Sequence, residues 1–173
     1  MTETANSLGT QKISKLLIKQ AIPASVGILV MSLNMIVDTI FVGQWIGSMA
    51  IAAVTVVLPI VFLISSIGMG IGIGGSSIIS RAFGSNNFNK AYLTFGNQIS
   101  LTLVLSIFFV IIGILFYNPL LLLFGANGAI LEPATEYFNV LLFGVPFLAF
   151  AMMGNPVIRA EGKPKFAMYA MIL

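Results

Sequence analysis

Asp38 is the residue whose chemistry stands out first, because it is an acid inside a long apolar stretch. No charged residue occurs between Lys19 and Asp38, and none occurs from Thr39 to Ser80. A charged side chain at the centre of a membrane helix costs about 2.5–3.5 kcal/mol on insertion scales. Because desolvation favours the neutral form of a carboxyl group, we expect Asp38 to take up and release a cation, either H⁺ or Na⁺.

The spacing around Asp38 places it on one face of a helix, since residues three and four apart share a face. That face is small or polar, and consists of Gln20, Ala24, Gly27, Met31, Asn34 and Asp38. The opposite side is apolar and suits lipid. We therefore predict that Asp38 points into a helix bundle, with the Asn34 amide one turn away and able to hydrogen-bond the carboxyl group. The alternative is a solvated acid close to the end of the helix.

Pro23 interrupts the backbone hydrogen bonding early in the same helix. One interpretation is a passive kink, which membrane helices tolerate. The other is a hinge that bends the helix when Asp38 changes its charge state. The sequence leaves both interpretations open.

Polar groups in later apolar segments are candidate partners of this site or links between helices. Asn155 could join the ion site, because a carboxylate site needs further oxygen or amide groups. Buried amides such as those of Asn97 and Gln98, and the hydroxyl group of Thr102, more commonly join one helix to another.

A glycine-rich segment contains a formal G-x-G-x-x-G pattern from Gly70 to Gly75. It does not predict a dinucleotide-binding loop, because it lies within an apolar span and has no strand before it. Small residues four apart instead let helices approach closely. We therefore predict helix-packing roles for Gly68, Gly70, Gly72 and Gly74.

The composition requires a membrane environment. The chain is 58% hydrophobic and 8% charged, whereas a soluble domain carries about 25% charged residues. It has no Cys and no His, which removes disulfides, thiol chemistry and nearly every nucleophilic triad, so we do not expect an enzyme. The few basic residues lie beside apolar segments, where lipid headgroups explain them better than nucleic acid does.

The apolar segments predict an all-α fold, a polytopic transmembrane helix bundle, because a membrane helix needs about 20 apolar residues. The expected spans are about 15–42, 50–80, 91–117 and 135–158. A cytoplasmic tail (1–14) precedes them, and a fifth helix begins at about 164. Since that last helix is too short to cross the bilayer, we expect the rest of a larger transporter chain to follow Leu173.

The basic residues predict the orientation. If the four spans alternate, all eight Lys and Arg residues fall on one side: Lys12, Lys15, Lys19, Arg81, Lys90, Arg159, Lys163 and Lys165. The opposite loops carry Glu132 and Glu136. Because basic loops remain inside the cell, we expect a multi-pass protein of the cell (inner or plasma) membrane with a cytoplasmic N-terminus.

Three motifs, in order along the chain, resemble the multidrug and toxic compound extrusion (MATE) family of transporters. The segment 34–43, with Pro23 upstream, resembles the first-span motif of that family. The segments 80–84 and 159–165 are similar to its two inside loops. The resemblance covers the chain from about Ser14 onward.

The resemblance implies two six-helix lobes around a central cavity, with 15–173 forming part of the first lobe. It implies an antiporter that needs no cofactor and exports cationic or amphipathic drugs in exchange for H⁺ or Na⁺. By the same resemblance Asp38 is the ion-coupling residue, Asn34 and Asn155 belong to its network, and Pro23 is the kinking proline. The family's other ion-site residues, on the fifth span, fall beyond Leu173.

The sequence leaves two alternatives open. One is a lipid-linked oligosaccharide flippase of related architecture, which should carry Lys or Arg within its spans to hold an anionic head group. The other is a small membrane scaffold subunit.

Overall fold

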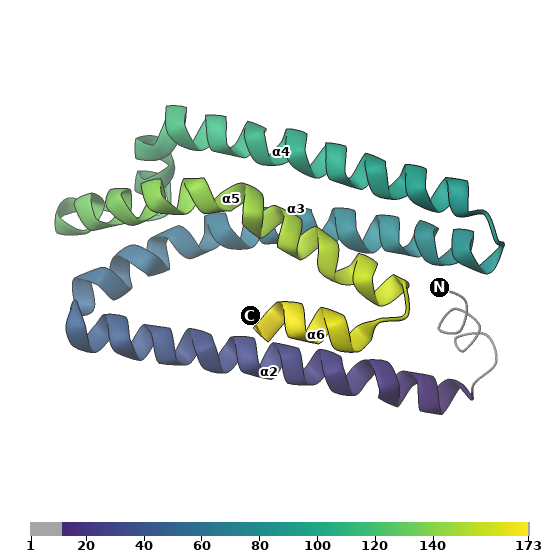
Figure 1. Ribbon diagram of the computed structural model, residues 1–173. Coiled ribbons are helices and arrows are strands. Elements are labelled where there is room, and N and C mark those ends of the chain that lie inside the picture. The colour runs from purple at the N-terminus through teal and green to yellow at the C-terminus, as the bar shows by residue number, and fades with distance from the viewer. Residues whose placement is uncertain (1–11, 173) are drawn as a thin grey trace.

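The computed structural model describes residues 12–172, so the expected tail lies largely outside the described residues. Within this range the chain forms helices joined by short turns (Figure 1). In chain order these are α2 (Ile13–Trp45), α3 (Ser48–Gly84), α4 (Phe88–Leu123), the 3₁₀ helix η1 (Gly128–Ile130), α5 (Leu131–Ala160) and α6 (Pro164–Ile172). The predicted all-α, polytopic fold is confirmed.

Four helical segments are long and apolar enough to cross a membrane: α2, α3, α4 and Gly128–Ala160. Each has 33 to 37 residues, which corresponds to about 50 Å at the helical rise per residue. Because the hydrocarbon core is only about 30 Å thick, their ends extend past it. The spans expected from the sequence therefore lie inside these helices, and α3, for example, continues to Gly84 rather than ending at 80.

Two tight connections join α2 to α3 and α3 to α4. Gly47 lies between α2 and α3 with a φ of 109°, a backbone conformation that favours glycine. At the start of α4 the Asn87 side chain accepts a hydrogen bond of 3.1 Å from the Lys90 backbone N–H, which caps the helix. The second turn places α3 and α4 side by side and antiparallel, whereas the first holds only the adjoining ends of α2 and α3 together.

α4 changes direction near its C-terminal end (Figure 1). The backbone leaves helical geometry at Phe116, where φ is −122° and ψ is 23°. The sequence places the end of this span slightly later, at Asn118-Pro119. The break comes before the proline because its ring clashes with the carbonyl four residues back and distorts the preceding turn. After the break the chain continues helically and buries Leu121 completely.

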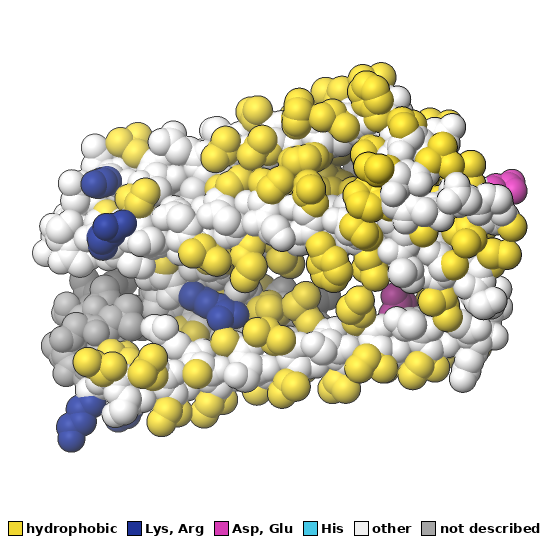
Figure 2. All heavy atoms as spheres, turned by 180° about the vertical axis from the view of Figure 1, so that it is seen from behind, with side chains coloured by type: hydrophobic (Ala, Val, Ile, Leu, Met, Phe, Trp, Pro, Cys, Tyr) yellow, Lys and Arg dark blue, Asp and Glu magenta, His cyan; other side chains and the backbone are white. Residues whose placement is uncertain are grey.

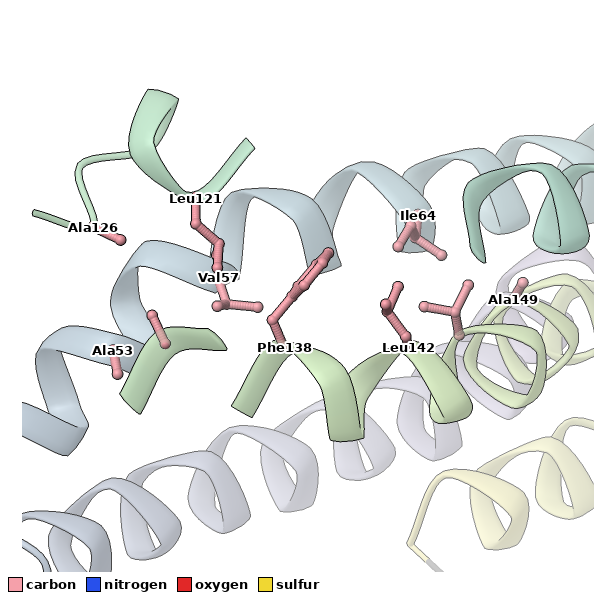
Figure 3. Close-up of a cluster of buried hydrophobic side chains, with 10 residues drawn as sticks. Ala53, Val57, Ile64, Leu121, Ala126, Phe138, Leu142 and Ala149 are labelled. Carbon is pink, nitrogen blue, oxygen red and sulfur yellow. The ribbon is translucent and has the colours of Figure 1, made fainter. Parts of the chain in front are cut away.

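The packed part of the molecule consists of α3, α4 and α5, and the interface between α3 and α5 is the most extensive. This packed part contains two apolar clusters. Figure 3 shows side chains of α3 and α5 meeting in the larger one, with Leu121 beside Val57. The buried members are Ala53, Val57, Ile64, Leu121, Ala126, Ala134, Phe138, Leu142, Val145 and Ala149. A smaller cluster continues toward the other end of these helices, and contains Ile79, Ala82, Ala91, Met153 and Val157.

α2 lies apart from this packed unit. It packs chiefly against α6 and makes only a small contact with α3. Only two of its residues, Pro23 and Gly27, are buried. Figure 1 shows the reason: α2 diverges from α3 beyond their connecting turn, and α6 lies between α2 and α5.

The basic side chains gather at one end of the long axis of the bundle, where Lys163 also pairs with Glu161 at 3.3 Å. The start of α2, the α3–α4 turn and the α5–α6 turn all lie at one end (Figure 1), and these are the segments that carry the eight basic residues. In Figure 2 the Lys and Arg side chains gather on one half of the visible face and the acidic side chains on the other.

Candidate functional site

Asp38 lies in the half of α2 that leads to the α2–α3 turn, seven residues before the helix ends at Trp45. Its side chain and that of Asn34 are both exposed. The one side-chain hydrogen bond described on this stretch runs from Thr39 Oγ1 to the Met35 carbonyl, at 2.8 Å. The expected bond between the Asn34 amide and the Asp38 carboxyl group is therefore not formed among residues 12–172.

Neither face of this half of α2 is covered by the described helices. Met31, on the face predicted to point inward, is 41% exposed, and Leu33, on the face predicted to meet lipid, is 60% exposed. The described residues therefore cover neither face here, because α3 and α5 diverge from α2 at this level (Figure 1). The sequence pattern identifies a polar face but does not identify the element that covers it.

The candidate hinge is the part of α2 that is packed. Pro23 and Gly27 are buried beneath α6. An added Cβ atom on Gly27 would lie 3.2 Å from Met171 Sδ and 3.8 Å from the Met168 Cα atom. The segment that could bend therefore lies against α6, while the segment that carries Asp38 is exposed and meets α3 only near the turn, where an added Cβ on Gly43 would lie 2.8 Å from Ile51 Cδ1.

Asn155 belongs to a different contact from Asp38. Its Nδ2 donates to the Ala167 carbonyl on α6 at 3.1 Å, and its Oδ1 accepts from Arg159 Nε at 3.0 Å. Arg159 Nη2 also approaches Met171 Sδ at 3.5 Å. These bonds join the end of α5 to α6, at the basic end of the bundle, whereas Asp38 lies toward the opposite end (Figure 1). The structure does not bring the two predicted ion-site residues together.

The four glycines predicted to pack divide into two pairs. An added Cβ on Gly68 would lie 2.8 Å from the Ala149 carbonyl oxygen, and one on Gly72 would lie 2.6 Å from the Met153 carbonyl oxygen. Both contacts are to the backbone of α5. Gly70 and Gly74 have nothing within 4 Å at the same position. Residues two apart on a helix face nearly opposite directions, so only one of the two pairs can meet α5.

A buried polar row on α4 is only partly visible in the sequence. Gln98, Thr102 and Ser106 are four residues apart and 5%, 1% and 2% exposed. Gln98 Nε2 donates to the Ile71 carbonyl on α3 at 2.7 Å, and Gly75 leaves room for the Gln98 side chain. The sequence indicates Gln98 and Thr102 as interhelical contacts, but it misses Ser106, although the regular spacing of four could have identified it.

A cation at Asp38 would have one acidic ligand from this part of the chain. Within residues 12–172, no three His, Cys, Asp or Glu side chains lie close enough together to hold a metal ion. A proton needs one carboxylate, whereas Na⁺ at this position would need neutral oxygens from other segments as well.

These features match one protein family. The MatE family model matches residues 23–173, a range that includes Pro23, Asp38 and all four long helices except the start of α2. The chain belongs to the MatE family. The predicted resemblance to MATE transporters is therefore confirmed.

Individual relatives of the MatE family agree with this assignment. The chain is 32% identical over 150 residues to the FAD transporter of Shewanella oneidensis, covering 87% of this chain and 33% of that protein. It is 28% identical to the probable multidrug resistance protein YoeA of Bacillus subtilis, covering 100% of this chain and 38% of that protein. The chain thus spans about a third of the length of these relatives.

A solved structure shows the same arrangement of helices. The MATE multidrug transporter DinF-BH is 40% identical to this chain and superimposes with a TM-score of 0.90. The match covers 99% of this chain and 39% of that one. The fold of the described residues is therefore that of one part of a MatE transporter.

Proposed function

We propose that this chain is part of a cation-coupled antiporter that exports cationic or amphipathic drugs across the cell membrane by alternating access. The observation that carries the proposal is Asp38, an acid on the one long helix that the rest of the described chain leaves largely unpacked. The named multidrug relatives support the direction and the substrate class. The ion would be H⁺ or Na⁺, and no cofactor and no enzymatic step are required.

The coupling rests on the difference in charge between the two states of Asp38. A ligand shifts a conformational equilibrium only by its differential affinity for the two conformations. Removing a carboxylate charge from an apolar environment is worth about 2.5–3.5 kcal/mol, which corresponds to a population shift on the order of a hundredfold. We infer that binding of a cation favours a conformation in which Asp38 is surrounded by protein, and that α2 bends near Pro23 to reach it.

The position of the packed residues supports a bend at Pro23. α6 holds Pro23 and Gly27, and the Gly47 turn holds the far end of α2 to α3. Between these two attachments the helix has exposed side chains on both faces. Asn34 lies one turn from Asp38 and moves with it, so the amide remains a candidate partner of the carboxyl group in the second conformation. Asn155 lies farther from Asp38, so it would influence the second conformation only through its hydrogen bond to α6.

We also infer that the N-terminus is cytoplasmic. All eight basic residues lie in segments at one end of the bundle, and α5, which carries Glu132 in its first turn, begins at the opposite end (Figure 1). The positive-inside rule assigns the basic end to the cytoplasm.

Export of FAD is the second candidate, and the identity to the FAD transporter of Shewanella oneidensis favours it. FAD carries phosphate groups, so a cavity that binds it needs positive charge. The basic side chains here gather at one end of the bundle, which supports a cationic substrate instead (Figure 2). The same charge distribution does not favour a flippase for an anionic lipid-linked oligosaccharide.

The test is dye export by the full transporter chain that carries this sequence. We expect Asp38→Asn to abolish export of a cationic rhodamine dye, because a neutral side chain cannot exchange a cation, and Asp38→Glu to retain part of it. Glu132→Gln is the matched control, since Glu132 is an exposed acid on a different helix, α5, and it should export like the wild type. Undiminished export by Asp38→Asn would contradict the role of Asp38. Export of FAD without export of the dye would show that FAD, and not a cationic drug, is the substrate.

A further inference from the structure

The crossing of α3, α4 and α5 contains a small cavity that the transport proposal does not use. Its volume is about 10 Å³, and its lining combines apolar side chains with Gly68, Thr102, Ser106 and Ala149. A cavity of roughly 10–15 Å³ is the smallest that holds one water molecule. The size therefore fits a single water and excludes any larger ligand.

The polar side chains of the cavity come from one row on α4. Thr102 is 1% exposed, and its Oγ1 has no hydrogen-bond partner among residues 12–172. Ser106 is 2% exposed, and its Oγ donates to the Leu103 carbonyl at 2.9 Å, which leaves its lone pairs free to accept. Residues four apart on a helix are neighbours on the same face, so both hydroxyl groups line the cavity together.

A third polar group comes from α5. The Ala149 carbonyl oxygen lies 2.8 Å from the position of an added Cβ on Gly68, so the absence of a side chain on Gly68 lets this part of α5 approach α3 closely at the edge of the cavity. Ala149 and Gly68 both line the cavity. The cavity therefore offers one free donor on Thr102, a free acceptor on Ser106 and a backbone acceptor on Ala149. A buried water molecule typically makes two to four hydrogen bonds, and these groups supply that number.

We propose that one water molecule is bound at this crossing, accepting a hydrogen bond from Thr102 Oγ1 and donating to Ser106 Oγ and the Ala149 carbonyl. Buried hydroxyl groups in a membrane protein are stable only when they have partners, since no solvent reaches them. The water would satisfy Thr102 and would link α4 to α5 at a level where Gly68 brings α3 against α5.

The test uses radiolytic labelling of the full transporter chain in lipid nanodiscs. X-ray pulses convert bound water into hydroxyl radicals, which oxidise the side chains beside it, and mass spectrometry identifies those side chains. Leu105 and Phe109 line the cavity and report on it. Trp45 is 81% exposed at the α2–α3 turn and serves as the dose reference.

We expect oxidation of Leu105 and Phe109 in the wild type and its loss in Thr102→Val, which keeps the shape of the side chain but removes the hydroxyl group. Thr102→Ser keeps the hydroxyl group and should keep the labelling. The matched control is Thr94→Val on the same helix, because the Thr94 hydroxyl group donates to the Lys90 carbonyl at 2.8 Å and Thr94 does not line the cavity.

Two results would overturn the proposal. One is a wild type without oxidation at Leu105 and Phe109, which shows a dry cavity and does not depend on any variant. The other is a Thr102→Val variant that is labelled as strongly as the wild type. Neither result depends on transport, so the water site and the proposed function are tested separately.

Discussion

α2 and α3 are similar in length and both are strongly apolar, yet they pack very differently. α3 has 37 residues and eight of them are buried, whereas α2 has 33 residues and two are buried. The difference lies in the small residues. α3 presents Gly68, Gly72 and Gly75 at steps of three and four and accepts α5 and Gln98 against its backbone. α2 has Gly27 as its only buried glycine, and only α6 packs there.

Apolar composition and helix packing are therefore separate properties. Hydrophobic residues place a helix in the membrane, but lipid is as apolar as Leu, so close backbone contact and interhelical hydrogen bonds are needed to hold two helices together. α3 has close backbone contact with α5 and accepts hydrogen bonds from Gln98 of α4, while the half of α2 that carries Asp38 has neither among the described residues. The acid therefore lies on the long helix that the described residues pack least.

The largest effect should come from filling the contact between α3 and α5. Gly72→Ala places a methyl group 2.6 Å from the Met153 carbonyl oxygen, and a backbone atom cannot rotate away. Overpacking of this kind costs about 1–3 kcal/mol, so we expect a clear fall in the thermal midpoint of the purified transporter. Gly74→Ala is the control, because nothing lies within 4 Å of the same position. Equal thermal midpoints of the two variants would contradict the distinction between a packed and a free face of α3.

A smaller effect is expected at the junction of α5 and α6. Asn155→Ala removes the hydrogen bond to the Ala167 carbonyl and the acceptor for Arg159. Interhelical hydrogen bonds in membrane proteins average about 0.6 kcal/mol and reach about 1.7. We therefore expect a modest fall in the thermal midpoint, with faster hydrogen exchange confined to α6 and the adjoining part of α2. Asn139→Ala, at an exposed position of the same helix, should change neither quantity. Unchanged exchange in α6 would show that Asn155 does not hold this junction.

The sequence predicts the helices well because each span is determined by its own residues. Uninterrupted apolar segments mark the spans, and Pro119 marks the break in α4 to within a few residues. The basic residues also predict which helix ends lie together, because the side on which each basic segment falls depends only on the alternation of the spans. The helix ends themselves extend further than expected, since polar residues such as Ser80 continue the helix past the hydrocarbon.

The contacts of the site could not be predicted in the same way. A helical wheel shows that Asp38 shares a face with Asn34 and Gly27, but it cannot show that α6 covers Gly27 and leaves Asp38 exposed. An amide such as that of Asn155 identifies a polar contact without identifying its partner. For these residues the decisive information lies in the relative positions of the helices, which no periodicity within one helix contains.

The most direct test of the account is a measurement of distances between helices in the full transporter chain. The sequence has no Cys, so spin labels can be placed as pairs at Leu33→Cys and Phe62→Cys on α2 and α3, and at Ile73→Cys and Phe147→Cys on α3 and α5. All four positions are more than half exposed. We predict a broad distance distribution for the α2–α3 pair that shifts on acidification or addition of Na⁺ and no longer responds in Asp38→Asn. The α3–α5 pair should give a narrow distribution that does not change. An α2–α3 distribution that is equally narrow and insensitive to both cations would contradict the claim that α2 moves with the charge of Asp38.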